Sequence, residues 1–222
     1  MVPSAWMTMR ALRGIAAVIG LLALCGAGSP PAAGDPMIDC LSDDNGRRIE
    51  GCSLLIDDPE RSPEQKSFAY GMRALAYSLQ GVFDQALADY DKAIGLNPDY
   101  SVALNNRAWV YFKLGRGREG VDDVERALKL SPGSPYALDT RAHIRQAEGD
   151  VEAALADYER AMRNGGDHMV KVYQCGLRAQ GLYFGMIDGV RSGAVSRALR
   201  ACVGNQSCDP LPADEDCTPS VS

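Results

Sequence analysis

The sequence contains few of the residues on which metal-dependent or nucleophilic catalysis depends. Only two histidines, His143 and His168, occur among its 222 residues, and both are distant in sequence from any cysteine cluster. There is no Cys-x-x-Cys pair, no His-Glu-x-x-His, no Gly-x-Ser-x-Gly and no glycine-rich phosphate loop. The metal, nucleophile and phosphate sites that these motifs mark are not indicated. We therefore expect a non-enzymatic protein with no catalytic residue, no metal and no cofactor.

Basic residues are in the minority. The chain has 23 Lys and Arg against 29 Asp and Glu, which gives a net charge of −6. Proteins that hold a polyanion through bulk electrostatics are usually basic. Nucleic acid is therefore not an expected partner.

The first 34 residues contain no Asp or Glu, and Asp35 is the first acidic residue of the chain. Arg10 and Arg13 precede an apolar run over residues 14–25, which is too short to span a bilayer comfortably. Small residues and prolines follow it. This pattern predicts a secretory signal peptide over residues 1–34 and a periplasmic or secreted protein. Two membrane-bound alternatives stay open: an uncleaved anchor, and lipidation of Cys25, since residues 22–25 resemble a bacterial lipoprotein box.

Six cysteines lie outside the predicted signal peptide, and an even number in an exported chain indicates disulfides. We expect Cys40 to pair with Cys52, within an N-terminal segment over residues 35–66. The other four permit three pairings that the sequence does not rank. The six residues are Cys40, Cys52, Cys175, Cys202, Cys208 and Cys217.

A 34-residue period runs through the middle of the chain, with one apolar helical pattern before each repeated glycine and another after it. Proline residues in Asn97-Pro98 and Ser131-Pro132 end the second helix of the first two periods. The columns in register are Gly81, Gly115 and Gly149; Ala74, Ala108 and Ala142; Arg73, Arg107 and Arg141; Ala93, Ala127 and Ala161; and Asp89, Asp123 and Asp157.

This pattern resembles the tetratricopeptide repeat, with three repeats over residues 67–166. The second repeat departs from the family at Gly117 and Gly120, and the third ends in Gly165-Gly166 instead of a proline. The resemblance implies an all-α, right-handed solenoid of helical hairpins. A helix over residues 48–56 is expected to cap its first end. The first repeat carries the pattern in Tyr70, Ala74, Tyr77, Gly81, Phe83, Ala86, Tyr90, Ala93 and Pro98.

The resemblance also implies that the first helices of the repeats line a groove for a peptide or protein partner. The lysine and asparagine clamp that some members use for a terminal carboxylate is not visible, so an apolar or mixed ligand is expected. In the other interpretation, Trp109 and Phe112 pack between repeats. The groove candidates are Phe68, Leu75, Asn105, Trp109, Phe112, Tyr136, Asp139 and His143.

Residues 167–203 resemble the peptidoglycan-binding-like helical domain of bacterial envelope proteins. Tyr183 and Asp188 are its possible cell-wall contacts, although a turn aspartate commonly serves as a local cap. An acidic tail over residues 204–222 contains three prolines, and its cysteines are expected to staple it to the module. The matching residues are Gln174, Leu177, Gly181, Tyr183, Gly185, Ile187, Asp188, Gly189, Ala198 and Leu199.

Together these features predict an exported adaptor of the bacterial cell envelope that binds a protein or peptide. The alternative is a peptidoglycan-binding protein in which the C-terminal module carries the recognition.

Overall fold

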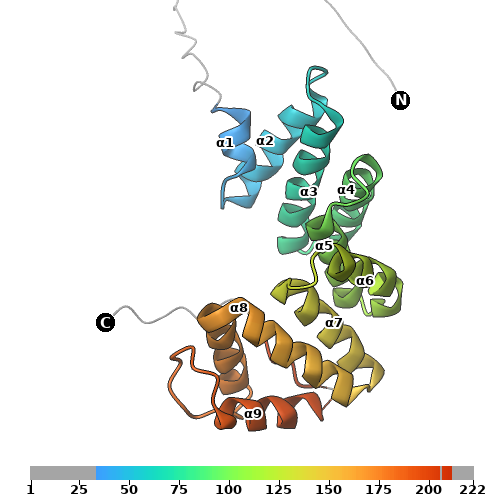
Figure 1. Cartoon of the computed structure of the whole chain (residues 1–222). Coiled ribbons are helices and arrows are strands. Elements are labelled where there is room, and N and C mark those ends of the chain that lie inside the picture. Colours follow the sequence, from blue (N-terminus) through green and yellow to red (C-terminus); the bar gives the residue numbers. More distant parts are fainter. Residues whose placement is uncertain (1–33, 206, 212–222) are drawn as a thin grey trace, which may run out of the picture. The chain divides into compact units, whose positions relative to one another are not determined.

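The computed structural model describes residues 34–205 and 207–211, and every regular element among them is a helix (Figure 1). Residues 1–33 of the predicted signal peptide, with Cys25, and residues 212–222 of the tail, with Cys217, lie outside the described residues. No helix of the described ranges is both long and apolar enough to cross a membrane. The elements are α1 (Pro36–Cys40), α2 (Asn45–Asp57), α3 (Pro63–Leu79), α4 (Phe83–Leu96), α5 (Ser101–Lys113), the 3-10 helix η1 (Gly117–Gly120), α6 (Val121–Leu130), α7 (Pro135–Glu148), α8 (Val151–Ala179) and α9 (Gly193–Val203).

Three antiparallel hairpins form the three predicted repeats: α3 with α4, α5 with α6, and α7 with the first half of α8. Each helix packs against the next along the chain, and the first helices also contact one another, α3 with α5 and α5 with α7. The expected cap helix is α2, which packs on α3 together with the short α1. The fold is therefore the predicted all-α solenoid with a capped first end.

Local sequence signals set where the helices begin and end. Helix α3 begins at Pro63, because the side chains of Ser62 and Gln65 each accept a hydrogen bond from the other residue's backbone N–H and so form a capping box. The glycine column closes the first helix of each hairpin, with φ of 73°, 71° and 84°. These left-handed conformations favour glycine. In the second repeat, where Gly117 and Gly120 depart from the family, η1 replaces the first turn of the second helix.

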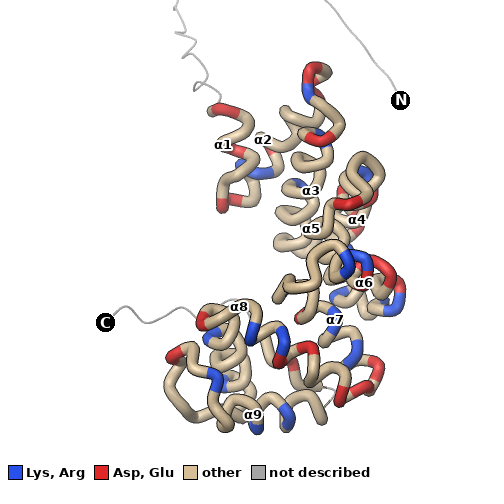
Figure 2. The backbone as a smooth tube through the Cα atoms, viewed as in Figure 1, with Lys and Arg blue, Asp and Glu red and all other residues tan. Residues whose placement is uncertain are grey.

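An arginine in the first helix of each hairpin binds an aspartate in the second helix. Arg107 donates from Nε and Nη2 to the two carboxylate oxygens of Asp123, at 2.7 and 2.8 Å. Its Nη1 donates to Asp91 of the preceding hairpin at 2.6 Å. Charged residues of both signs are distributed along the hairpins (Figure 2). Each arginine therefore joins its own hairpin and the helix before it. The equivalent pairs are Arg73 with Asp89 and Arg141 with Asp157.

The chain does not divide into separate bodies at residue 166. Helix α8 runs through this position with a kink at Gly166, where φ is 63°. Leu177 and Leu199 share one buried core with Leu138 and Tyr158 of the third hairpin. The described residues thus form one compact unit, and the predicted C-terminal module is packed onto the last repeat.

The predicted disulfide between Cys40 and Cys52 is confirmed, and a second joins Cys202 to Cys208. Cys175 is not a free thiol either. Of the partners that the sequence left open for Cys202, the structure has Cys208, which is the nearest of them in sequence at a separation of 6 residues. This bond closes the chain just after α9 and turns the following residues back toward α7.

Candidate functional site

Three of the groove candidates, Trp109, Phe112 and His143, meet on one side of α5 and α7. The rings of Trp109 and Phe112 lie 5.2 Å apart between centroids. Both rings also contact the imidazole of His143, at 5.2 and 5.4 Å. Trp109 and Phe112 are partly exposed, whereas His143 is only 3% exposed. Trp109 and Phe112 on α5 are therefore in contact with His143 on α7, across the junction of the second and third repeats. The two α5 side chains are partly exposed, whereas His143 is buried.

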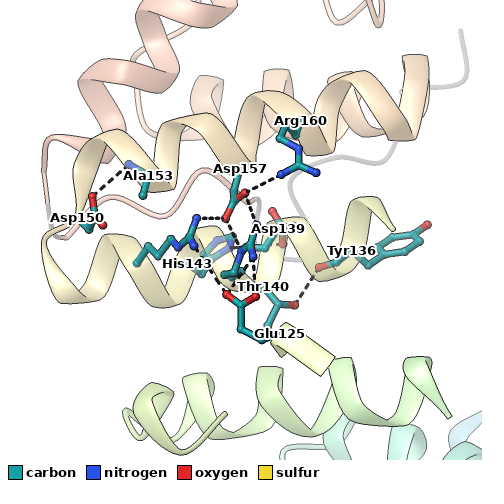
Figure 3. Close-up of polar contacts among 11 residues, drawn as sticks. Glu125, Tyr136, Asp139, Thr140, His143, Asp150, Ala153, Asp157 and Arg160 are labelled. Atoms are coloured by element: carbon teal, nitrogen blue, oxygen red, sulfur yellow. Dashed lines mark hydrogen bonds and ion pairs between the residues drawn. The ribbon is translucent and has the colours of Figure 1, made fainter. Parts of the chain in front are cut away.

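His143 is buried because the C-terminal strap (residues 207–211) covers it. Its Nε2 lies 3.2 Å from Oδ1 of Asp209 in the strap. On the other side, Nδ1 lies 2.9 Å from the carbonyl oxygen of Asp139. The Asp139 carboxylate is itself buried and accepts a hydrogen bond from the hydroxyl of Tyr173 on α8. Figure 3 shows Asp139 and His143 on α7, within the polar contacts of the third repeat. Asp139 and His143 were predicted to line an open groove, but in the structure the chain's own residues occupy that position.

Two further contacts fix the strap. Gln146, one turn beyond His143, donates from Nε2 to the carbonyl oxygen of Cys208 at 2.7 Å. The backbone of Pro210 approaches α8 at Gly176, where an added Cβ would lie 2.1 Å from the Pro210 carbonyl oxygen. Glycine is therefore required at position 176 for the strap to lie where it does. The disulfide at Cys208 secures the other end of the strap.

Asn105 and Tyr136 lie at a different place from the aromatic cluster. They line a cavity between α5, α6 and α7, together with Ser101 and Asn106. Asn105 is 7% exposed, and its Nδ2 donates to Asn106 at 3.2 Å. Its buried Oδ1 has no hydrogen-bond partner in the described part of the chain. An unpaired buried acceptor is costly, so this amide oxygen suits a ligand that brings an N–H donor.

The two groove candidates of the first repeat, Phe68 and Leu75, lie on α3. Phe68 is partly buried against the small core that the Cys40–Cys52 disulfide forms with α2. Leu75 is partly exposed on α3. Of the eight candidates, the structure leaves Phe68, Leu75, Trp109 and Phe112 partly exposed, and Tyr136 is highly exposed.

Tyr183 and Asp188 serve the loop that they belong to. Tyr183 is 5% exposed, and its hydroxyl donates to the carbonyl oxygen of Met186 at 2.8 Å. Asp188 accepts hydrogen bonds from Gln174 Nε2 and from the backbone of Val190, both at 2.8 Å. The predicted cell-wall contacts are therefore already engaged locally, and Tyr183 is buried.

The buried charges around His143 make the strap sensitive to pH. Burial acts to lower the pKa of His143, but the attraction of Asp139 and the hydrogen bond to Asp209 outweigh it, so this pKa is raised above 6.5. Burial acts to raise the pKa of Asp209, but the bond to His143 outweighs it, and this pKa is lowered from 3.8. Tyr158 and Tyr173 also face this cluster from α8, and Lys113 of α5 attracts Asp209.

A raised histidine pKa stabilises the folded arrangement below pH 6.5, and this contribution is lost as the pH rises through the folded-state value. The contribution of Asp209 is present above pH 3.8 and is lost as the pH falls through its lowered folded-state value. We therefore expect the strap to be held most firmly at mildly acidic pH. Hydrogen-exchange protection factors of Leu211 and its neighbours should fall as the pH rises above 6.5 and through the raised folded-state pKa of His143. His143→Gln should remove this dependence, whereas the matched change at the exposed His168 should not. An unchanged profile in His143→Gln would contradict the assignment.

Several residues of this arrangement were not predicted from the sequence. Gln146, Tyr173 and Asp209 carry no motif, and Asp209 is 66 residues from its partner. The arginine and aspartate columns were visible, and their constant 16-residue offset could have indicated the ion pairs. The described residues contain no group of three or more His, Cys, Asp or Glu side chains that could hold a metal ion.

Two segments of the chain match the tetratricopeptide repeat family, residues 67–100 and residues 102–134. These are the first two hairpins of the fold. Among solved structures, the chain is similar to the crystal structure of MamA, with 19% sequence identity and a TM-score of 0.47. That similarity covers 55% of this chain and 68% of MamA. No curated protein gives a match to the chain. The fold is thus an all-α solenoid of helical hairpins, the first two of which match the tetratricopeptide repeat, and such repeats indicate an adaptor that binds other proteins.

Proposed function

We propose that this protein is an exported, non-enzymatic adaptor that binds a peptide segment of a protein partner along α5. The observation that carries the proposal is the partial exposure of Trp109 and Phe112 on the first helix of the second repeat. Aromatic side chains that are fixed by neighbours and still accessible are frequent binding anchors. The disulfides support export, because such bonds persist in oxidising compartments. We place the protein in the bacterial cell envelope.

The strap defines the length of this binding surface. It covers Asp139 and His143, so the partly exposed Phe68, Leu75, Trp109 and Phe112 remain available to the ligand. The Asn105 cavity provides a further contact. The unpaired Oδ1 of Asn105 would accept a hydrogen bond from a backbone or side-chain N–H of the ligand. A short apolar segment with one such donor fits this surface best.

We expect Trp109→Ala to weaken binding of the partner by about 2 kcal/mol, roughly thirtyfold in Kd, because an aromatic anchor that the ligand covers is lost. A peptide selected from a random library on the immobilised protein supplies the ligand. Titration can follow tryptophan fluorescence, since Trp6→Phe leaves Trp109 as the single tryptophan of the chain. Affinity of the alanine variant is then measured by calorimetry.

Tyr111→Ala is the matched control, because Tyr111 is also a partly buried aromatic residue of α5. It should leave the affinity within about threefold of wild type. If Trp109→Ala instead lowers the free energy of unfolding by about 3 kcal/mol and leaves binding unchanged, Trp109 is a packing residue. The binding surface would then have to lie elsewhere.

A further inference from the structure

The loop between α8 and α9 exposes an unusual number of large apolar side chains. Phe184 is 88% exposed, Met186 76%, Val190 58% and Ile187 36%. Isolated apolar residues on a surface are ordinary, but four within seven consecutive positions form a patch. An exposed apolar patch of this kind marks a surface that binds a protein or a membrane.

Hydrogen bonds hold the backbone of this loop in place, so the exposure of its apolar side chains does not result from an unsupported loop. Gln174, which is fully buried on α8, accepts a hydrogen bond from Gly189 and donates to Asp188 and to the carbonyl oxygen of Val190. The buried Tyr183 hydroxyl binds Met186 from the other side of the loop. The polar groups are thus turned inward and the apolar side chains outward. This is a rigid display of Phe184 and Met186.

The surroundings of the loop are basic, although the chain as a whole is acidic. Residues 167–204 contain five Lys and Arg against two Asp, a local net charge of +3. Arg197 lines one shallow depression with Phe184, and Arg191 lines another with Val190. Neither arginine forms an ion pair within the described part of the chain. Figure 2 shows basic positions along α9, next to this loop.

We infer that the loop over residues 184–190 docks the protein on an anionic lipid bilayer. Phe184, Met186 and Val190 enter the boundary between headgroups and acyl chains, while Arg191 and Arg197 pair with headgroup phosphates. A protruding apolar loop inside a basic collar fits a bilayer, because a fluid apolar medium needs no complementary groove and an anionic surface matches the collar. The groove along α5 would then remain free for its protein partner. This docking surface is separate from the one that we propose for the ligand.

Vesicle binding tests this inference with the full chain. We expect co-sedimentation with vesicles of phosphatidylglycerol and phosphatidylcholine in equal parts, and at least about tenfold weaker binding to phosphatidylcholine alone. Binding should weaken as salt is raised, because the headgroup attraction is screened. Phe184→Ser combined with Met186→Ser should weaken it about tenfold or more, because apolar burial in the bilayer is lost. Arg191→Gln combined with Arg197→Gln should have a comparable effect.

Matched controls test whether vesicle binding depends on the loop itself or on exposed apolar residues and positive charge anywhere on the protein. Leu79→Ser changes a residue that is 59% exposed on α3, and Lys92→Gln combined with Lys129→Gln removes the same charge elsewhere. Both should bind vesicles like the wild type. Since every variant retains the apolar residues 14–25, the differences between variants decide the outcome. Equal binding of the loop variants and the wild type would overturn the inference, as would the absence of vesicle binding. Binding of purified sacculi that is lost in the loop variants, without vesicle binding, would assign the loop to peptidoglycan instead.

Discussion

Arg107→Met should lower the free energy of unfolding by about 3 to 5 kcal/mol, since it leaves a buried carboxylate without its partner. Asp123 is 9% exposed, and its carboxylate accepts two hydrogen bonds from the Arg107 guanidinium. The same arginine also holds Asp91 of the preceding hairpin. Its loss therefore weakens the second hairpin and its junction with the first. Urea unfolding followed by circular dichroism at 25 °C measures the effect.

The double variant Arg107→Met with Asp123→Leu should recover a large part of this loss, because the buried charge is removed with its partner. Arg118→Met is the matched control. Arg118 is 88% exposed in its pair with Glu148, and exposed ion pairs contribute about 1 kcal/mol at most. A loss below about 1 kcal/mol in Arg107→Met would show that the arginine column does not hold the repeats together.

Removal of the Cys40–Cys52 disulfide should cost about 3 kcal/mol of stability, the largest effect that we expect outside the arginine column. The bond joins residues 12 apart and lies in a small core in which both cysteines are fully buried. That core covers the apolar face of α3, including Ala69 and the partly buried Phe68. In a solenoid, each unit is stabilised by its neighbours, so loss of the cap should loosen the first hairpin before the third.

The double variant Cys40→Ala with Cys52→Ala tests this by urea unfolding and by hydrogen exchange resolved along the chain. Protection should fall most in α2 and α3. Cys202→Ala with Cys208→Ala is the comparison, because its shorter loop of 6 residues predicts a smaller loss of about 2 kcal/mol, confined to the strap and α9. Equal loss of protection in the first and third hairpins would contradict the role of the cap.

The 34-residue period was sufficient to predict the helical hairpins, because its signals are local. Apolar spacing sets which face of a helix is buried, and prolines and glycines determine where each helix ends. The first bond, Cys40 to Cys52, was also predictable, since both cysteines lie in one short segment. Even the unusual second repeat was visible in Gly117 and Gly120, where the structure has a 3-10 turn.

The accessible part of the candidate groove could be decided only by the tertiary structure. Trp109, Asp139 and His143 have equivalent helical periodicity, so the sequence alone assigns them to the same surface. What distinguishes them is a segment more than 60 residues later that crosses α7 and places Asp209 on His143. A contact at that separation depends on the path of the whole chain, on the kink at Gly166 and on the Cys202–Cys208 bond. The sequence therefore placed these residues on one helix face, whereas long-range packing determined which of them stay exposed.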